Sequence, residues 1–351
     1  MRSNRMSTGP RDAKDASHGL SRDDASTARS GVAAIRRIDD LVYASPEGNP
    51  LLADLYLPGG AGEPPPVIVW LHGGGWRFGD RRLAPDLSRY FASSGFAMAS
   101  IDYRLTTDAI FPAQIEDVKT AIRWLRAVAS RYGFDGRRIG LWGASAGGHL
   151  AALAATSGPG VFESAASEHA EQSSDVQAVV DGYGPTDFLQ MDAHRDPFDR
   201  PSDDPESIAL PAGMRTIHAN SFESLLVGGP IEQYQDRVRL ANPIAYNRAN
   251  VPPFLILHGL SDTTVPAHQS ELLFEALAAR GVDATLYLQE GLGHGFLNRD
   301  RLEAQPGART SARRAVNGVV TAAPDPEPLS FELIGSFFER TLRLVRKYSD
   351  S

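Results

Sequence analysis

The chain has 351 residues, of which 42% are hydrophobic and 22% are charged, a balance that is typical of a globular protein and excludes disorder throughout. The formal net charge is −8 and the chain holds no Lys-rich run, so we expect no nucleic-acid partner. Cysteine is absent, so a covalent nucleophile would have to be Ser, Thr, Lys or a carboxylate. No apolar run approaches the ~20 residues of a membrane-spanning helix, so we expect no membrane partner.

Residues 1–30 are rich in Ser, Asp, Arg, Ala and Gly and carry few apolar side chains. We expect a disordered amino-terminal arm there, followed by a single domain over residues 31–351. A secretory signal would need an apolar run of about 7–15 residues after a basic start, and the arm has none. The chain is therefore predicted to be cytoplasmic.

Short apolar runs alternate with helical patterns from residue 35 onward. The runs 35–44 and 51–57 flank a turn rich in Pro, Gly and Asn and predict an antiparallel hairpin. The later runs lack polar alternation, which is typical of strands buried on both faces: 67–71, 96–101, 139–142, 178–180, 254–257 and 284–288. Apolar positions three and four apart predict helices at 112–132, 146–156, 266–280 and 329–347. The sequence thus predicts an α/β fold with a mostly parallel eight-stranded sheet and helices on both faces.

Two segments interrupt this alternation. Residues 182–251 are too many for a plain crossover, and their Pro, Asp and Gly content predicts loops and short helices in a cap-like insertion over one end of the sheet. No long amphipathic helix emerges there, so we expect a bounded pocket and not a lipid-activated lid. Residues 300–328, rich in Arg, Ala, Gly and Pro, are predicted to form a second long connection.

The strongest chemical motif is the run Gly143-Ala144-Ser145-Ala146-Gly147, which lies between the strand 139–142 and the helix 146–156. A serine flanked by small residues at such a reversal is typical of a nucleophile elbow, in which a strained turn exposes the hydroxyl. A Gly-rich turn without function is the alternative for a motif this short. The sequence around it decides between the two.

A second motif, His72-Gly73-Gly74-Gly75-Trp76, directly follows the strand 67–71. Consecutive glycines let backbone N–H groups converge where an oxyanion forms during acyl transfer. A flexible loop is the alternative interpretation. Because His72 precedes the glycines and does not follow a late strand, we expect it to be structural and not a catalytic base.

Two further residues follow in the chain order that the elbow motif predicts, which is serine, then acid, then histidine. Asp262 lies in the loop after the strand 254–257, and His294 lies in a glycine-flanked loop after the strand 284–288. Both loops are at the carboxyl ends of strands, where open α/β sheets bind ligands. Asp262 could instead cap the helix that follows it, but four coordinated placements favour a catalytic triad.

With these residues the sequence resembles α/β-hydrolases of the hormone-sensitive-lipase-like carboxylesterase type, and more closely bacterial esterases similar to feruloyl and acetyl esterases. The resemblance covers about residues 35–346. It includes four further stretches: 102–105 (DYRL), 111–118 (FPAQIEDV), 184–188 (GPTDF) and 242–244 (NPI). Residues 106–108 (TTD) depart from the Ala-Pro-Glu of many relatives, and the insertion at 300–328 is a second departure.

The resemblance implies that Ser145 is the nucleophile, His294 the general base and acid, and Asp262 its orienting carboxylate. The implied oxyanion donors are the backbone N–H groups of Gly74, Gly75 and Ala146. Arg104 and Asp117 are expected to be structural. Trp76 is expected to form one wall of a pocket for a small acyl group or an aromatic acid. No metal and no cofactor is expected, the partner is a small-molecule ester, and a homodimer is left open.

Several alternatives remain open on the sequence. The runs around Trp76 and Ser145 also resemble kynurenine formamidases, which cleave an aryl formamide with the same triad. A biosynthetic acyltransferase or cyclase could use the same fold, because fold and triad do not fix the acceptor. A non-catalytic ligand-binding protein would need a lost triad member, and all three are present. The acidic residues 192–206 with His194 fit a solvated loop better than a metal site.

Overall fold

The computed structural model describes residues 34–60, 62–163, 168–195, 214–299, 302 and 307–343. The predicted amino-terminal arm lies outside these residues. No helix of the described ranges is both long enough and apolar enough to cross a bilayer.

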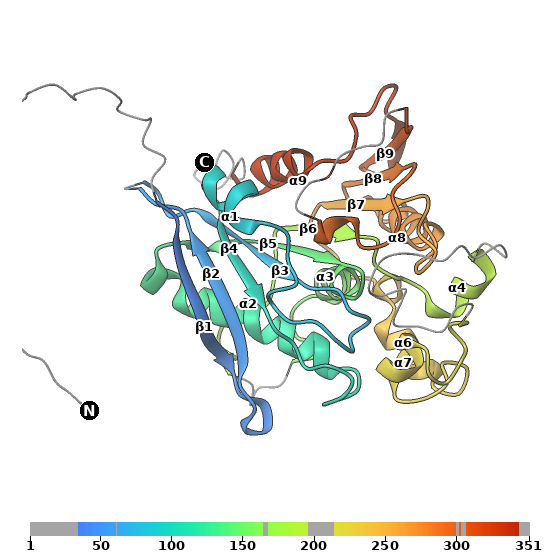
Figure 1. The fold of residues 1–351 in the computed structure, drawn as a ribbon, viewed down its shortest axis with the longest axis horizontal. Helices are drawn as coiled ribbons and strands as arrows, with labels where there is room; N and C mark the ends of the chain where they lie inside the picture. The colour runs from blue at the N-terminus through green and yellow to red at the C-terminus, as the bar shows by residue number, and fades with distance from the viewer. Residues whose placement is uncertain are drawn as a thin grey trace, which may run out of the picture. The chain divides into compact units, whose positions relative to one another are not determined.

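A single sheet organises the domain (Figure 1). Its strands follow one another in space in the order β1-β2-β4-β3-β5-β6-β7-β8-β9-β10. Pairing is parallel from β4 through β8 and antiparallel at both edges. The bounds are β1 Arg36–Ala44, β2 Leu51–Leu57, β3 Pro66–Leu71, β4 Ala97–Ile101, β5 Asp135–Ala144, β6 Ala178–Gly182, β7 Phe254–Gly259, β8 Ala284–Gln289, β9 Thr310–Val316 and β10 Val319–Ala322.

The α/β fold class is confirmed, but the predicted number of eight strands is wrong, because the described residues form a sheet of ten. The eight predicted strands are β1 to β8, and the connection 300–328 adds the hairpin of β9 and β10. Apolar periodicity misses this hairpin because β9 buries only two alanines and β10 is exposed along its whole length. The signal that could have found it is Asn317-Gly318, both with positive φ, a pair typical of a two-residue hairpin turn.

The central strands are buried on both faces, as their unbroken apolar runs predict. In β3, Val67 and Val69 pack into one core, while Ile68 and Trp70 pack into the other. The first core is covered by α2 (Ala113–Tyr132), α3 (Ala146–Ser157) and α8 (His268–Ala279). The second is covered by α1 (Leu87–Tyr90) and α9 (Phe331–Phe338), on the opposite face of the sheet (Figure 1). A π-helical turn, Glu339–Arg343, continues from α9.

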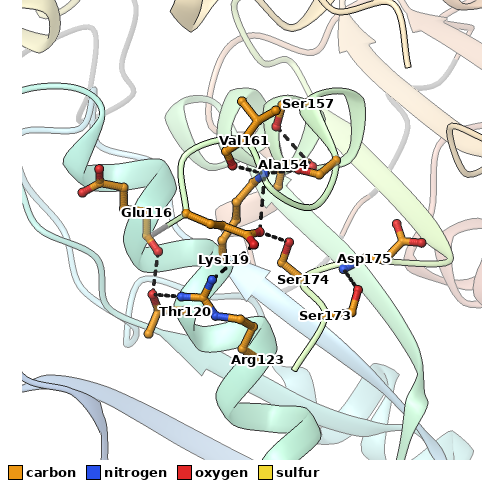
Figure 2. Close-up of polar contacts among 12 residues, drawn as sticks. Glu116, Lys119, Thr120, Arg123, Ala154, Ser157, Val161, Ser173, Ser174 and Asp175 are labelled. Atoms are coloured by element: carbon orange, nitrogen blue, oxygen red, sulfur yellow. Dashed lines mark hydrogen bonds and ion pairs between the residues drawn. The ribbon is translucent and has the colours of Figure 1, made fainter. Parts of the chain in front are cut away.

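A buried lysine anchors the carboxyl end of α3, the helix that begins directly after Ser145 (Figure 2). Lys119 of α2 donates to the carbonyl oxygens of Gly158 and, at 2.6 Å, Val161, just beyond that helix. A cation is favourable there because the last carbonyls of a helix carry partial negative charge. Burial lowers the pKa of Lys119 to about 8, although the nearby Glu163 carboxylate opposes the shift. The far end of α3 is thereby fixed to α2.

The segment between β6 and β7 consists of short helices where it is described: α4 (Phe188–His194), α6 (Phe222–Val227), α7 (Gln235–Ala241) and the 3-10 turn Pro243–Ala245. Side-chain caps begin three of them: Asp187 on α4, Ser221 on α6 and Asn242 on the 3-10 turn. Phe188 and Phe222 are buried and pack toward the glycine run that follows β3. This insertion therefore lies over the carboxyl end of the sheet.

Candidate active site

Ser145 lies at the turn between β5 and α3. Its backbone angles, φ 53° and ψ −120°, are rare for any residue other than glycine. The turn is held by two backbone hydrogen bonds: Ser145 N–H donates to Gly182 O at 2.8 Å, and His149 N–H donates to Ser145 O at 3.0 Å. Such strain persists only where the surroundings over-determine it, and it clusters at functional sites. The geometry is that of the elbow predicted from the sequence.

Glycines at 143 and 147 make this turn possible because the chain passes itself at very short range. A Cβ added to Gly143 would stand 2.1 Å from the carbonyl oxygen of Gly147. A Cβ added to Gly147 would stand 2.1 Å from the carbonyl oxygen of Leu71, at the end of β3. The serine turn and the end of β3 are therefore in direct contact.

Asp262 and His294 lie on two loops that are tied to each other at the ends of β7 and β8. Leu260 N–H donates to Gln289 O at 2.8 Å, and Ser261 N–H donates to Leu292 O at 2.9 Å. Because β5, β6, β7 and β8 are parallel neighbours, their carboxyl ends bring these loops to the same sheet edge as Ser145.

Ser145, His294 and Asp262 form one chain of hydrogen bonds. His294 Nδ1 lies 2.7 Å from Asp262 Oδ2, and His294 Nε2 lies 2.9 Å from Ser145 Oγ. A carboxylate only accepts hydrogen bonds, so Nδ1 carries the ring proton and Nε2 is left to accept the serine O–H. All three side chains are buried, with Ser145 4% and His294 1% exposed.

The Asp262 carboxylate is fully engaged. Its Oδ1 accepts the N–H groups of Thr264 and Val265, each at 2.9 Å, and its Oδ2 faces His294. Burial alone would raise the pKa of Asp262, but electrostatic interactions and hydrogen bonds with His294 and His258 outweigh it and hold that pKa well below its ordinary value. Asp262 therefore stays ionised at neutral pH.

The glycine run after β3 adopts conformations that need glycine. Gly74 has φ 110° and Gly75 has φ 57°. A Cβ on Gly74 would stand 2.0 Å from the carbonyl oxygen of Phe78, and one on Gly75 would stand 2.4 Å from the ring of Phe222. The run is thus folded tightly beneath the insertion. It lies beside the serine turn because β3 and β5 pair in register, with Leu71 opposite Gly143.

The predicted structural residues lie outside the hydrogen-bond chain: His72 at the start of the loop, and Arg104 with Asp117 between the end of β4 and α2. His72 lies 2.6 Å, through Nδ1, from Gly73 O, and its ring stacks on Tyr103 with 4.2 Å between centroids. Arg104 grips the Asp117 carboxylate with Nε at 2.9 Å and Nη2 at 2.8 Å. None of these side chains joins the hydrogen-bond chain of Ser145.

The sequence did not single out Arg81, which is the buried cation that follows the loop. It is 3% exposed and binds Asp54 at 2.8 Å, Asp102 at 2.9 Å and Asp40. These three carboxylates come from β1, β2 and the end of β4, so Arg81 fixes the outgoing end of the glycine loop to the sheet. The sequence around Arg81 is typical of a loop and contains no pattern that predicts a buried cation.

Trp76, predicted to form one wall of the pocket, is a fully packed ring. It is 1% exposed, with its ring 5.0 Å from that of His149 and 5.6 Å from that of Phe188. The Trp76 carbonyl accepts the N–H of Thr106 at 2.7 Å, within the stretch that departs from many relatives. Trp76 Nε1 has no hydrogen-bond partner within the described part of the chain.

His149 is a second residue that the sequence did not single out. It lies in the first turn of α3, is fully buried, and through Nε2 contacts the carbonyl oxygen of Ala241 at 2.7 Å. It therefore ties the helix after Ser145 to the insertion. Burial lowers the pKa of His149 to about 4, and the bond to Ala241 only partly offsets this.

Where the chain is described, no group of three or more His, Cys, Asp or Glu residues is arranged to hold a metal ion.

The fold, the serine turn and the loops after β7 and β8 together define an α/β-hydrolase. The chain belongs to the BD-FAE family, whose model matches residues 53–277. The resemblance to hormone-sensitive-lipase-like carboxylesterases expected from the sequence is thereby confirmed.

Known proteins of similar sequence and structure are esterases by name. Esterase LipC of Mycobacterium tuberculosis is 34% identical over 254 residues, which cover 71% of this chain and 58% of LipC. The chain thus spans a little over half the length of that relative. A truncated carbohydrate esterase from gut microbiota is 31% identical with a TM-score of 0.63, over 75% of this chain and 90% of that one. The esterase Est2 of Thermogutta terrifontis with propionate bound is 26% identical with a TM-score of 0.56, over 76% and 85%.

Proposed function

We propose that this protein is a serine carboxylesterase that hydrolyses esters of small acyl groups or aromatic acids through an acyl-enzyme. The observation that carries the proposal is the hydrogen-bond chain from Ser145 through His294 to Asp262, with separations of 2.9 and 2.7 Å, at a strained strand-to-helix turn. Membership of the BD-FAE family and similarity to named esterases support the same reaction.

In the proposed mechanism, His294 takes the Ser145 proton as Oγ attacks the ester carbonyl carbon. Asp262 keeps the ring proton on Nδ1 and stabilises the imidazolium that forms. The imidazolium then gives its proton to the departing alcohol, and the acyl group stays on Oγ. Water, activated by the same imidazole, attacks the acyl-enzyme and releases the acid.

The tetrahedral oxyanion is proposed to bind the backbone N–H groups of Gly74, Gly75 and Ala146. Support comes from the contact between the serine turn and the end of β3, the strand from which the glycine run continues. Ala146 N–H adds the start of α3, where the partial positive charge of the helix favours an anion.

A small acyl group is favoured by how closely the insertion covers the site. Phe188 and Phe222 are buried against the rings of Trp76 and Phe78, and Ser145 itself is 4% exposed. The described helices of the insertion have six or seven residues, too short for an interfacial lid. The propionate in the Thermogutta structure is an acid of the proposed size.

Covalent labelling tests the nucleophile directly. A fluorophosphonate should react with wild-type protein by attack of Ser145 Oγ on phosphorus and loss of fluoride, and peptide mass spectrometry should place the adduct on Ser145. Ser145→Ala should lose the label and about 10⁴-fold or more in kcat. Ser93→Ala, at an exposed serine distant in sequence, is the matched control and should keep both. A label that persists in Ser145→Ala would refute the assignment.

The size of the acyl group is tested with p-nitrophenyl esters from acetate to palmitate. Each methylene that the pocket buries contributes about 0.8 kcal/mol, so kcat/KM should rise over the first few carbons and fall once the chain outgrows the pocket. Methyl hydroxycinnamates and N-formylkynurenine in the same panel compare aromatic esters with the formamide. A maximum at palmitate, or a jump in rate when the substrate aggregates, would identify a lipase instead.

A further inference from the structure

A second histidine shares the triad carboxylate. His258, the fifth residue of β7, is fully buried, and its Nε2 lies 3.3 Å from Asp262 Oδ2, the oxygen that His294 Nδ1 also approaches. The same Nε2 lies 2.9 Å from the carbonyl oxygen of Val265. Both neighbours of Nε2 are acceptors, so Nε2 carries a proton and donates to them.

The other ring nitrogen of His258 is held by a hydroxyl. Its Nδ1 lies 2.7 Å from Ser270 Oγ, on the first turn of α8. With a proton on Nε2, the neutral ring accepts the Ser270 O–H at Nδ1. The two acceptors at Nε2 therefore set the tautomer of His258, and Ser270 holds the orientation of its ring.

We propose that His258 is a positioning residue of the triad, a role that rests on the proposed function: its Nε2–H fixes the direction of Asp262 Oδ2 and restrains how strongly that oxygen holds the His294 proton. His258 touches neither Ser145 nor the reacting atoms in this arrangement. It acts through Asp262 alone.

The hydrogen bonds to the Asp262 carboxylate predict how loss of His258 changes the pKa of His294. Thr264, Val265 and His258 donate to this carboxylate and stabilise its negative charge, so Oδ2 attracts the His294 proton less strongly. Without the His258 bond, Oδ2 would become more basic and bind the imidazolium more tightly, and it could also rotate away from Nδ1.

The other groups that face His258 are Tyr183, with 6.3 Å between ring centroids, and Asp181 of β6, which interacts with it electrostatically. Burial raises the pKa of Asp181 to about 6, and His258 opposes that rise.

The test is the pH dependence of kcat/KM for p-nitrophenyl acetate in His258→Leu and His258→Gln. Leucine removes the donor, and kcat should fall by about 10- to 100-fold with KM nearly unchanged, because a hydrogen bond to a charged group is lost. The apparent pKa of the acid limb should rise by roughly half a unit to one unit. Glutamine places an N–H donor near the position of Nε2, so it should restore most of kcat and the wild-type acid limb.

A structural role alone would give a different pattern. Phe254→Leu, at the other end of β7, is the control for lost packing and should lower thermal stability while leaving kcat and the acid limb unchanged. Wild-type kinetics in His258→Leu would overturn the proposal. So would equal losses in the Leu and Gln variants without a shift of the acid limb.

Two further measurements keep the test decisive. If His258→Leu does not fold, Ser270→Ala replaces it. Loss of the hydroxyl removes the hydrogen bond that Nδ1 accepts, which makes Nε2–H a weaker donor to Asp262 and should raise the apparent pKa of the acid limb in the same direction. An unchanged acid limb in Ser270→Ala would then overturn the proposal. Fluorophosphonate labelling of wild-type protein separates the two proposals: a labelled wild type with unaffected His258 variants refutes the role of His258 alone, whereas no label at Ser145 refutes both.

Discussion

The Cα of Gly147, two residues after Ser145, lies against the backbone carbonyl of Leu71 at the end of the neighbouring strand β3. A methyl group at this Cα would stand 2.1 Å from the Leu71 carbonyl oxygen and 2.6 Å from that of His72. Both obstacles are backbone atoms of a central strand and its exit, which cannot move aside cheaply. The spacing between the serine turn and the glycine loop therefore depends on the missing side chain at position 147.

Gly147→Ala should accordingly separate the two loops, or prevent folding. We expect a loss of at least about 3 kcal/mol in the free energy of unfolding, or a folded protein in which kcat is severely reduced. Gly335→Ala in α9 is the matched control, since nothing lies within 4 Å of its added Cβ and its φ is not positive. That control should gain about 0.5–1 kcal/mol. Urea unfolding and esterase assays measure the stability and kcat of the two variants. If Gly147→Ala were as stable and as active as Gly335→Ala, the close approach of Gly147 to β3 would not be needed.

Asp262→Asn should lower kcat by about 10⁴-fold while circular dichroism and the unfolding temperature show a folded protein. An amide at this position can donate to His294 Nδ1, which would move the ring proton to Nε2 and leave no acceptor for the Ser145 hydroxyl. Asp283→Asn, at an exposed carboxylate before β8, serves as the control and should keep wild-type kcat. An active Asp262→Asn enzyme would show that another group orients His294.

Arg81→Met should destabilise the protein by about 3–5 kcal/mol, because it removes the buried cation that binds the buried Asp54 carboxylate and the partly buried Asp102 carboxylate; only the half-exposed Arg37, at 3.6 Å, then remains near Asp54. Its neighbour Arg82 is two-thirds exposed and makes ion pairs only at 3.6 and 3.9 Å. Arg82→Met should therefore change the free energy of unfolding by less than about 1 kcal/mol. Urea denaturation of both variants measures the two free energies of unfolding. Similar losses in the two variants would show that the buried ion pairs of Arg81 stabilise the protein no more than the exposed ion pairs of Arg82.

The pH dependence of stability should reveal His149. Burial lowers its folded pKa to about 4, whereas the unfolded chain titrates near about 6.5, so the unfolded state binds the proton first on acidification. This histidine therefore costs stability as the pH falls from about 6.5 to about 4, by roughly 3 kcal/mol over the whole window. His149→Gln keeps a donor for the Ala241 carbonyl and removes the titration. Urea unfolding between pH 7.5 and 4.5 should show a shallower loss in the variant, and parallel curves would refute the assignment.

Prediction from sequence succeeded where the signal is local. The apolar runs of the central strands, such as 67–71 and 139–142, could be identified because burial on both faces removes polar residues altogether. The serine turn could be identified because glycine is needed wherever the backbone approaches another segment closely. The hairpin of β9 and β10 was missed because it buries few apolar side chains, although the dipeptide Asn317-Gly318 is typical of a hairpin turn.

The sequence by itself determined the alternating α/β architecture and the four loops that carry Ser145, Asp262, His294 and the glycine run, since parallel strands deliver their carboxyl ends to one edge of a sheet. Only the tertiary structure decided which charged and polar residues became partners. Arg81 meets Asp54 across 27 positions of sequence, and the His149 imidazole meets the carbonyl of Ala241 across 92. Such contacts depend on how two segments cross in space, and a buried charge or imidazole gains its partner from that crossing and not from its sequence neighbours.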